Sequence, residues 1–252
     1  MGHYALIGGK LGHSFSQRWF EDMFAREGLV GYTYALHEMS SLDGLRQWVT
    51  QEQIDGFNVT IPYKKSIISM LDTLSPEAQA IGAVNCVCVD HGRLIGNNTD
   101  APAFGETLDT WIDSNKKNHA FILGTGGAAH AVGYALKQRG IEYLYVSRNP
   151  EKWNADNEEI KVIGYTELAT NNWPPTTLII NATPVGMWPD IDSSPWPCPE
   201  QLNENMFVYD LIYNPSPTLL MRQASERGAR TTDGLAMLHR QAELSWQLWQ
   251  QL

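Results

Sequence analysis

Short apolar runs alternate with longer amphipathic segments over the N-terminal part of the chain. Residues 4–7 and 32–36 have the apolar character of strands, and residues 16–27 between them have the pattern of a helix. A third strand is predicted over residues 56–60. Pro62 follows it and predicts a helix start, because a residue in the first helical turn needs no partner for its N–H. This alternation predicts an α/β fold.

A polar Asp-His-Gly turn interrupts the apolar residues between positions 84 and 95. Two β-like runs on either side of such a turn predict a hairpin. A polar stretch at 96–100 follows the hairpin and suggests a domain boundary, and a helix-like segment at 103–112 and a polar connector at 113–118 come after it. We therefore predict a first domain over residues 1–101 and a second domain over residues 102–234.

The second half of the chain shows the same alternation around a glycine-rich turn. An apolar run at 120–123 enters the turn at 124–129, and a helix from about 129 to 138 precedes the next strand at 143–146. Strand, turn, helix and strand form one βαβ unit. Further elements are predicted as strands at 161–163, 178–180 and 207–209, and as an amphipathic helix at 235–252.

The composition indicates a folded chain and narrows the class of partner. Apolar residues make up 43% of the 252 residues and charged residues only 18%, so sizeable cores can form. The 28 acidic and 18 basic residues give a formal charge of −10, which argues against nucleic acid as a partner. No apolar run reaches the ~18 residues of a membrane span and no export leader is evident, so we expect a cytoplasmic protein without membrane contact.

The cysteines do not form a recognisable framework. There are three, an odd number, and Cys86 and Cys88 would share one face of a strand. No second cluster completes a zinc or disulfide pattern. We therefore expect reduced core cysteines and no metal site.

The turn Gly124-x-Gly126-x-x-Ala129 opens a helix directly after an apolar strand. Small residues at these positions permit a tight turn and let a pyrophosphate approach the helix N-terminus. In this context the turn predicts a dinucleotide site. The alternative is a plain strand-to-helix turn, with glycine for a positive φ and alanine for packing.

The residues after the second strand of this unit bear on which dinucleotide binds. An NAD site usually has a carboxylate there for the ribose 2′-hydroxyl, whereas this chain has Ser147-Arg148-Asn149 and then Lys152. The two cations favour the additional 2′-phosphate of NADP. The alternative is that Arg148 and Lys152 are solvated charges at a helix start.

Several other polar residues follow predicted strands or lie in turns. Residues 181–187 follow an apolar strand and would lie in the crevice where such sheets bind ligands, although an ordinary loop explains them equally well. Taken one at a time, the remaining residues are better explained as caps, turn residues or solvated charges. They are Ser14, Ser16, Lys64, Asn85 and Asp100.

Eight segments occur together in a specific order and spacing over nearly the whole chain. They are His13-Ser14-Phe15-Ser16, Gly56-Phe57-Asn58-Val59-Thr60-Ile61-Pro62-Tyr63-Lys64, Gly82-Ala83-Val84-Asn85, Asn98-Thr99-Asp100, Gly124-Thr125-Gly126-Gly127-Ala128, Asn181-Ala182-Thr183-Pro184-Val185-Gly186-Met187, Asp210-Leu211-Ile212-Tyr213-Asn214-Pro215, and Asp233-Gly234-Leu235-Ala236-Met237-Leu238 with Gln241. In this combination the chain resembles the shikimate dehydrogenase family from end to end.

The resemblance implies an architecture and a reaction. It implies an N-terminal α/β substrate-binding domain, a Rossmann-type doubly wound NADP-binding domain, and a C-terminal helix at 235–252 that returns to the first domain. The implied activity is the reversible NADP-dependent reduction of 3-dehydroshikimate to shikimate, in aromatic amino-acid biosynthesis. The partner would be this small molecule, and the protein a monomer or homodimer. The alternatives are a quinate/shikimate dehydrogenase and a catalytically silent paralogue that binds a metabolite and regulates a partner.

The resemblance also implies roles for individual residues. Lys64 and Asp100 would form the catalytic pair, and a cationic lysine can supply the proton that ketone reduction needs besides a hydride. The substrate pocket would be formed by Ser14, Ser16, Thr60, Asn85, Tyr213 and Gln241, with the two serines on the substrate carboxylate. The cofactor would be bound by Gly124, Gly126, Gly127, Ala128, Arg148, Asn149, Lys152, Thr183, Leu211, Gly234 and Met237.

Overall fold

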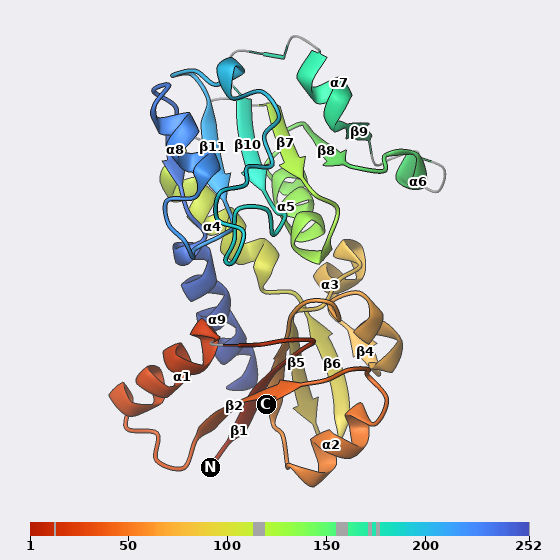
Figure 1. Ribbon diagram of the computed structural model, residues 1–252. Helices are drawn as coiled ribbons and strands as arrows, with labels where there is room; N and C mark the ends of the chain where they lie inside the picture. The colour runs from red at the N-terminus through yellow and green to blue at the C-terminus, as the bar shows by residue number, and fades with distance from the viewer. Residues whose placement is uncertain (13, 113–118, 155–160, 171–172, 175–176, 252) are drawn as a thin grey trace. The chain divides into compact units, whose positions relative to one another are not determined.

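The chain folds into two compact units, shown in the computed structural model of Figure 1. The structure describes residues 1–12, 14–112, 119–154, 161–170, 173–174 and 177–251. The first unit comprises Met1–Ala103 and His239–Leu252, and the second comprises Phe104–Leu238. Both divisions fall within helices, α4 (Asp100–Trp111) and α9 (Leu235–Trp249). The end of the polar stretch that suggested a boundary at residue 101 is the first turn of α4.

The first unit is built on a mixed sheet. Its strands are β1 (His3–Gly8), β2 (Thr33–Glu38), β3 (Gly56–Val59), β4 (Thr73–Leu74), β5 (Cys86–Asp90) and β6 (Arg93–Asn97). They lie in the order β2-β1-β3-β5-β6-β4. β1 is parallel to both of its neighbours, whereas β5 is antiparallel to β3 and to β6. The hairpin predicted between residues 84 and 95 is confirmed as β5 and β6.

Helices cover both faces of this sheet. They are α1 (Phe15–Arg26), α2 (Leu45–Gln51), the 3-10 helix η1 (Ser66–Met70), α3 (Pro76–Ile81) and α9. Ala5 and Ile7 of β1 pack in a core with residues of α2, η1 and α3. Tyr4 and Leu6 pack in a second core with residues of α1 and α9. The alternation follows from the two-residue period of a strand and explains why β1 is apolar throughout.

The prediction that Pro62 starts a helix is wrong. The residues after β3 form turns, and helical structure begins only with η1. The carbonyl oxygens of Ile61 and Lys64 accept hydrogen bonds from the N–H groups of Gly9 (3.0 Å) and Val84 (2.7 Å). Since these carbonyls bond to distant segments, they cannot take part in a helical ladder. The same contact ties Lys64 to the segment that leads into β5.

An aromatic cluster holds α9 on the first unit. Trp249 stacks on Tyr4, with ring centroids 4.6 Å apart and an interplanar angle of 21°. Its Nε1 donates a hydrogen bond to the carbonyl oxygen of Val87 at 3.0 Å. Gly56 leaves the space for this indole, because a Cβ at that position would collide with it. The C-terminal helix therefore packs on strands from the N-terminal part of the chain.

The second unit is built on a parallel sheet. Its strands are β7 (His119–Leu123), β8 (Tyr143–Ser147), β9 (Val162–Gly164), β10 (Thr177–Asn181), β11 (Phe207–Asp210) and β12 (Arg230–Thr232). They lie in the order β12-β11-β10-β7-β8-β9, and each described pair is parallel. This is the doubly wound order of dinucleotide-binding domains, and the strand order reverses between β7 and β10. The Rossmann-type sheet expected from the resemblance is confirmed.

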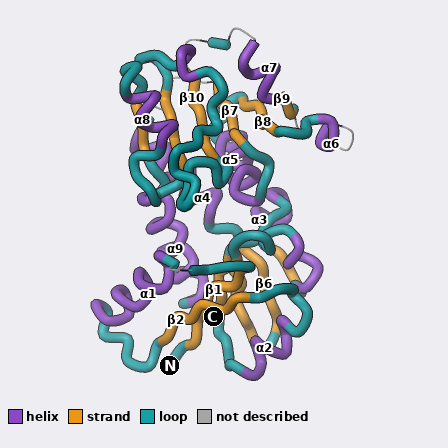
Figure 2. The backbone as a smooth tube through the Cα atoms, viewed as in Figure 1, coloured by secondary structure: helices purple, strands orange, loops and turns teal. Residues whose placement is uncertain are grey.

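Helices alternate with these strands along the chain (Figure 2). They are α4, α5 (Gly127–Gln138), α6 (Glu151–Asn154), α7 (Tyr165–Thr170), the 3-10 helix η2 (Pro199–Gln201) and α8 (Leu219–Ser225). The connector predicted at 113–118 lies outside the described residues. The sequence pattern did not predict β4, β12, α2, α3, α6, α7 or α8. The five helices have four to seven residues, two turns at most, which is too short to show a helical period. In the described parts of the chain, every helix is too short or too polar to cross a bilayer.

Candidate active site

A lysine and an aspartate from different segments of the first unit form a close ion pair. Lys64 lies in the turns after β3, and Asp100 is the first residue of α4. Lys64 Nζ donates to Asp100 Oδ2 at 2.6 Å. The side chains are 18% and 7% exposed, respectively. Asp100 also stands at a helix N-terminus, where the helix dipole favours a negative charge. The ammonium group is thus fixed in direction and still reaches solvent.

Asn85 links this pair to α9. Its Nδ2 lies 2.8 Å from Asp100 Oδ1, 2.9 Å from Thr99 Oγ1 and 3.5 Å from Gln241 Oε1. Its Oδ1 accepts a hydrogen bond from Thr99 N at 2.7 Å. The structure therefore brings together four of the residues that the resemblance implied for catalysis and substrate binding: Lys64, Asp100, Asn85 and Gln241.

A buried polar network behind Asn85 was not predicted from the sequence. Asn58 of β3 donates through Nδ2 to Asn85 O at 3.1 Å and to Ser245 Oγ at 2.9 Å. Asn58 Oδ1 accepts from the hydroxyl of Tyr34 at 2.8 Å, and Ser245 Oγ lies 3.2 Å from Thr99 Oγ1. One feature of the sequence could have indicated this network: Asn58 lies between apolar Phe57 and Val59 in a strand predicted to be buried. A buried amide needs hydrogen-bond partners.

The two serines implied for the carboxylate lie at the start of α1. Ser14 is the N-cap, and its Oγ accepts a hydrogen bond from Ser16 N at 3.2 Å. Both serines are half-buried. Phe15 between them stacks on His239 of α9, with ring centroids 5.1 Å apart. The start of α1 is therefore anchored to the helix that carries Gln241. His13, the first residue of this segment, lies outside the described residues.

The other two residues implied for the substrate pocket lie in different units. Thr60 follows β3 in the first unit, is half-buried, and donates its backbone N–H to Ile7 O at 2.9 Å. Tyr213 follows β11 in the second unit and is 38% exposed.

The glycine-rich turn after β7 has an open backbone at its tip. Gly124 has φ +103°, and a Cβ there would lie 3.0 Å from Thr183 Cγ2. Gly126 is the N-cap of α5, and a Cβ there would meet nothing within 4 Å. The N-terminus of this 12-residue helix is thus accessible to an anion, and the turn fits a pyrophosphate. Gly127 and Ala128 are the first two residues of α5 and are half-buried.

The residues implied for the 2′-phosphate follow the carboxyl end of β8. Arg148, Asn149 and Lys152 are all exposed. Asn149 N donates to Ser147 Oγ at 3.1 Å, which shapes the turn after the strand. The guanidinium and the ammonium are therefore free to approach a ligand phosphate.

The remaining residues implied for the cofactor are Thr183 after β10, Leu211 after β11, Gly234 after β12 and Met237 in α9. A Cβ on Gly234 would collide with the carbonyl oxygen of Leu211, so only glycine allows these two backbones to approach each other. Thr183 follows β10 and is half-buried, and Met237 of α9 is buried. Asp210, the last residue of β11, has no exposed surface and is a residue whose role was not predicted.

Burial raises the pKa of the Asp210 carboxyl from 3.8 to about 6, against the lowering effect of its three hydrogen-bond donors. The donors are Thr218 Oγ1, Ile212 N and Asn181 Nδ2 at 2.7, 3.0 and 2.9 Å. The nearby carboxylate of Asp233 acts in the same direction as burial. The folded chain therefore binds this proton more tightly than the unfolded chain does.

This raised pKa predicts a stability that falls with rising pH. The contribution of Asp210 is fully present below about pH 4 and is lost by about pH 6, and its total is about 3 kcal/mol. Asp210→Asn cannot titrate and serves as the reference. The free energies of unfolding of the parent and the variant are measured over this pH range. The value for the parent minus the value for the variant should fall steadily as the pH rises. A difference that is constant with pH would contradict the assignment.

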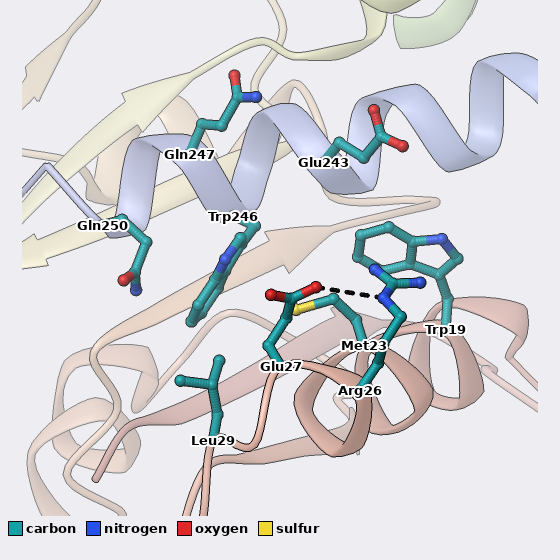
Figure 3. Close-up of a pocket in the computed structure, with 9 residues that line it drawn as sticks. All are labelled: Trp19, Met23, Arg26, Glu27, Leu29, Glu243, Trp246, Gln247 and Gln250. Atoms are coloured by element: carbon teal, nitrogen blue, oxygen red, sulfur yellow. Dashed lines mark hydrogen bonds and ion pairs between the residues drawn. The ribbon is translucent and has the colours of Figure 1, made fainter.

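A groove of 430 Å³ lies between α1 and α9 of the first unit (Figure 3). The indoles of Trp19 and Trp246 line it, together with Arg26 and Glu27, whose Nε and Oε1 atoms are 3.2 Å apart. Its described lining includes none of the residues implied for substrate or cofactor. The groove is therefore separate from the candidate active site.

Comparisons with known proteins agree with the sequence and the fold. Residues 6–87 match the family model of the shikimate dehydrogenase substrate binding domain. A relative from Caldanaerobacter subterraneus subsp. tengcongensis named shikimate dehydrogenase (NADP(+)) is 34% identical over 98% of this chain and 90% of its own length.

Several solved structures cover 100% of this chain. A chorismate mutase/shikimate 5-dehydrogenase fusion protein from Clostridium acetobutylicum is 37% identical, with a TM-score of 0.89 over 92% of its chain. Shikimate 5-dehydrogenase from Thermus thermophilus in complex with NADP(H) and shikimate is 34% identical, with a TM-score of 0.87 over 94% of its chain. The fold class expected from the sequence is confirmed. The chain belongs to the shikimate dehydrogenase family.

Proposed function

We propose that the protein is an NADP-dependent oxidoreductase that interconverts 3-dehydroshikimate and shikimate, a reaction of aromatic amino-acid biosynthesis. The observation that carries this proposal is the contact of Lys64 Nζ with Asp100 Oδ2 at 2.6 Å, with Asn85 on the other carboxylate oxygen. A relative that spans this chain almost completely is named shikimate dehydrogenase (NADP(+)), and the similar shikimate 5-dehydrogenase from Thermus thermophilus was solved in complex with NADP(H) and shikimate.

The chemistry divides between the cofactor and the lysine. NADPH, held by the turn at Gly124 and Gly126 and by Arg148, would supply the hydride that the carbonyl carbon of the substrate ring needs. Lys64 donates a proton to the carbonyl oxygen as the C=O π bond breaks, so that one C–H and one O–H bond form. Asp100 orients the ammonium toward the ring, and Asn85 orients Asp100. The neutral amine regains a proton from solvent, to which the Lys64 side chain is 18% exposed.

The substrate carboxylate would lie at the start of α1. Ser14 and Ser16 offer two hydroxyl groups beside the N-terminus of a 12-residue helix, which favours an anion. Thr60, Asn85, Tyr213 and Gln241 would complete the pocket. In this proposal the first unit is the substrate-binding domain and the second unit is the NADP-binding domain.

The cofactor would bind along the carboxyl edge of the parallel sheet. The pyrophosphate would lie against the turn at Gly124 and Gly126 and the first residues of α5, because nothing lies within 4 Å of a Cβ placed on Gly126. The residues expected to surround the remaining groups are Arg148, Asn149 and Lys152 for the 2′-phosphate, and Leu211, Gly234 and Met237 for the nicotinamide. Thr183 would be a further contact of the cofactor.

We further propose a cytoplasmic protein that acts as a monomer or homodimer on a small molecule. Cys86 and Cys88 are buried free thiols, as is usual in a reducing compartment. The formal charge of −10 disfavours binding to nucleic acid.

The direct test is NADPH oxidation by the purified chain with 3-dehydroshikimate. Turnover supports the proposal, and a second assay with quinate and NADP separates a strict shikimate dehydrogenase from a quinate/shikimate enzyme. Absence of turnover, in a protein that binds shikimate, would instead support a metabolite-binding paralogue.

Arg148→Ala is expected to raise the KM for NADP about 10-fold to 100-fold and to change the KM for NAD much less. A charge-assisted contact to phosphate is worth about 1.5–3 kcal/mol, and NAD has no 2′-phosphate to lose. Steady-state kinetics with both cofactors measure the two values. Lys137→Ala removes an exposed cation of α5 and is the matched control. Equal effects of Arg148→Ala on both cofactors would contradict the assignment.

A further inference from the structure

The buried carboxylate of Asp210 lies at the end of β11, next to the loop that follows β10. It has no exposed surface, and its three hydrogen-bond donors are neutral groups. Oδ1 accepts from Asn181 Nδ2 and Ile212 N, whereas Oδ2 accepts from Thr218 Oγ1. The two oxygens thus serve different parts of the second unit.

Through Oδ1, Asp210 sets the orientation of the Asn181 side chain. An ionised carboxylate only accepts hydrogen bonds, so the amide of Asn181 must turn its NH₂ group toward Asp210. Its Oδ1 then faces the loop and accepts from Thr183 N at 3.0 Å and Thr183 Oγ1 at 2.7 Å. The same NH₂ group reaches Val185 O at 3.2 Å. Asp210 therefore positions Thr183 indirectly, through the side chain of Asn181.

The same oxygen also fixes the turn that carries Leu211. Ile212 N donates to Asp210 Oδ1 at 3.0 Å, and Leu211 N donates to Asn181 O at 3.0 Å. Gly234 N in turn donates to Ile212 O at 3.2 Å, and Gly234 lies directly against Leu211. Thr183, Leu211 and Gly234, all assigned to the cofactor, are thus linked to Asp210 through Asn181 and Ile212.

Oδ2 has a separate, structural task. Thr218 is the N-cap of α8, and its Oγ1 accepts from Met221 N at 3.3 Å while donating to Asp210 Oδ2. Removing the Thr218 hydroxyl therefore disturbs α8 and leaves the contacts of Oδ1 intact. This separation makes the role of Oδ1 testable.

We infer that Asp210 is a positioning residue for the nicotinamide end of the dinucleotide site, acting through Asn181 on Thr183 and through Ile212 on Leu211. It does not itself touch the cofactor. The inference rests on the proposed function only in that Thr183 and Leu211 are taken as cofactor contacts.

The test compares NADPH affinity, by fluorescence titration, in the parent and four variants. Asp210→Ala and Asn181→Ala should weaken NADPH binding roughly 10-fold, because both leave Thr183 unpositioned. Asp210→Asn should restore near-parental affinity, since its carbonyl oxygen can accept from Asn181 and Ile212 while its NH₂ group faces Thr218 Oγ1. Thr218→Val should lower the melting temperature without changing NADPH affinity. The KM for 3-dehydroshikimate should change less than twofold throughout.

A second variant keeps the test valid if Asp210→Ala fails to fold. If Asp210→Ala does not melt cooperatively, Asn181→Ala gives the same comparison, because it leaves Asp210 its contacts with Ile212 and Thr218. Parental NADPH affinity in either folded variant, or an equal loss in Thr218→Val, would overturn the inference. A parent that binds NADPH but does not turn over 3-dehydroshikimate would defeat the proposed reaction and leave this comparison valid. A parent that binds no NADPH would overturn both.

Discussion

Lys64→Ala is expected to lower kcat by about 10²–10⁴-fold and to change the KM for 3-dehydroshikimate much less. In the proposed reaction the ammonium acts mainly in the transition state, where it stabilises the developing alkoxide and transfers its proton. Its contact with Asp100 at 2.6 Å fixes its direction before the substrate arrives. Steady-state kinetics in the direction of NADPH oxidation measure both constants.

Lys65→Ala is the matched control for this variant. Lys65 is the next residue along the chain, is exposed, and has no assigned role in the reaction. If Lys64 were only a solvated charge, the two variants would both turn over near the parental rate. Because Lys64→Ala leaves the nearly buried carboxylate of Asp100 without its cation, each variant must first be shown to melt cooperatively. A folded Lys64→Ala enzyme within a few-fold of the parental kcat would remove Lys64 from the mechanism.

Long elements of the fold could be predicted because their apolar pattern is set by local geometry. β1 and β7 were recognisable as continuous apolar runs, since strands buried on both faces lose the alternation of half-exposed ones. The turn at Pro62 was mispredicted for a reason that local sequence does not contain. Its carbonyl groups bond to Gly9 and Val84, which are distant in the chain.

The residues of the candidate site also include some that local sequence predicts and some that it does not. Gly124 and Gly126 could be predicted from their spacing after a strand, because the requirement for a tight turn is local. The pairing of Lys64 with Asp100 was implied only by the resemblance to a family, since 36 residues separate them. The contact of Asn58 with Ser245 spans 187 residues and could not be predicted from either segment.

The packing of α9 on the first unit affects both the fold and the candidate site. Its Gln241 lies 3.5 Å from Asn85, and its Ser245 reaches the network behind the site. An amphipathic pattern predicts that such a helix packs on something, but not on which surface. The partner surface is set by Gly56, which leaves room for Trp249, and by the ring of Tyr4, on which Trp249 stacks.

Trp249→Ala is therefore expected to lower the free energy of unfolding by about 3–5 kcal/mol, the usual range for removing a buried aromatic side chain. The indole is 4% exposed, stacks on Tyr4 and lies 5.4 Å from the ring of Phe20. Its loss also leaves the carbonyl oxygen of Val87 without its donor. Denaturant unfolding followed by far-ultraviolet circular dichroism measures the change.

Trp188→Ala removes an indole of the same size that is 68% exposed, and it is the matched control. A residue that buries little surface contributes little to stability, so this variant should unfold within about 0.5 kcal/mol of the parent. If Trp249→Ala were equally mild, the contact between α9 and the strands would contribute little to stability. The position of Gln241 beside Asn85 would then have to be held by the Ser245 network alone, and Ser245→Ala should in that case be the variant that raises the KM for 3-dehydroshikimate.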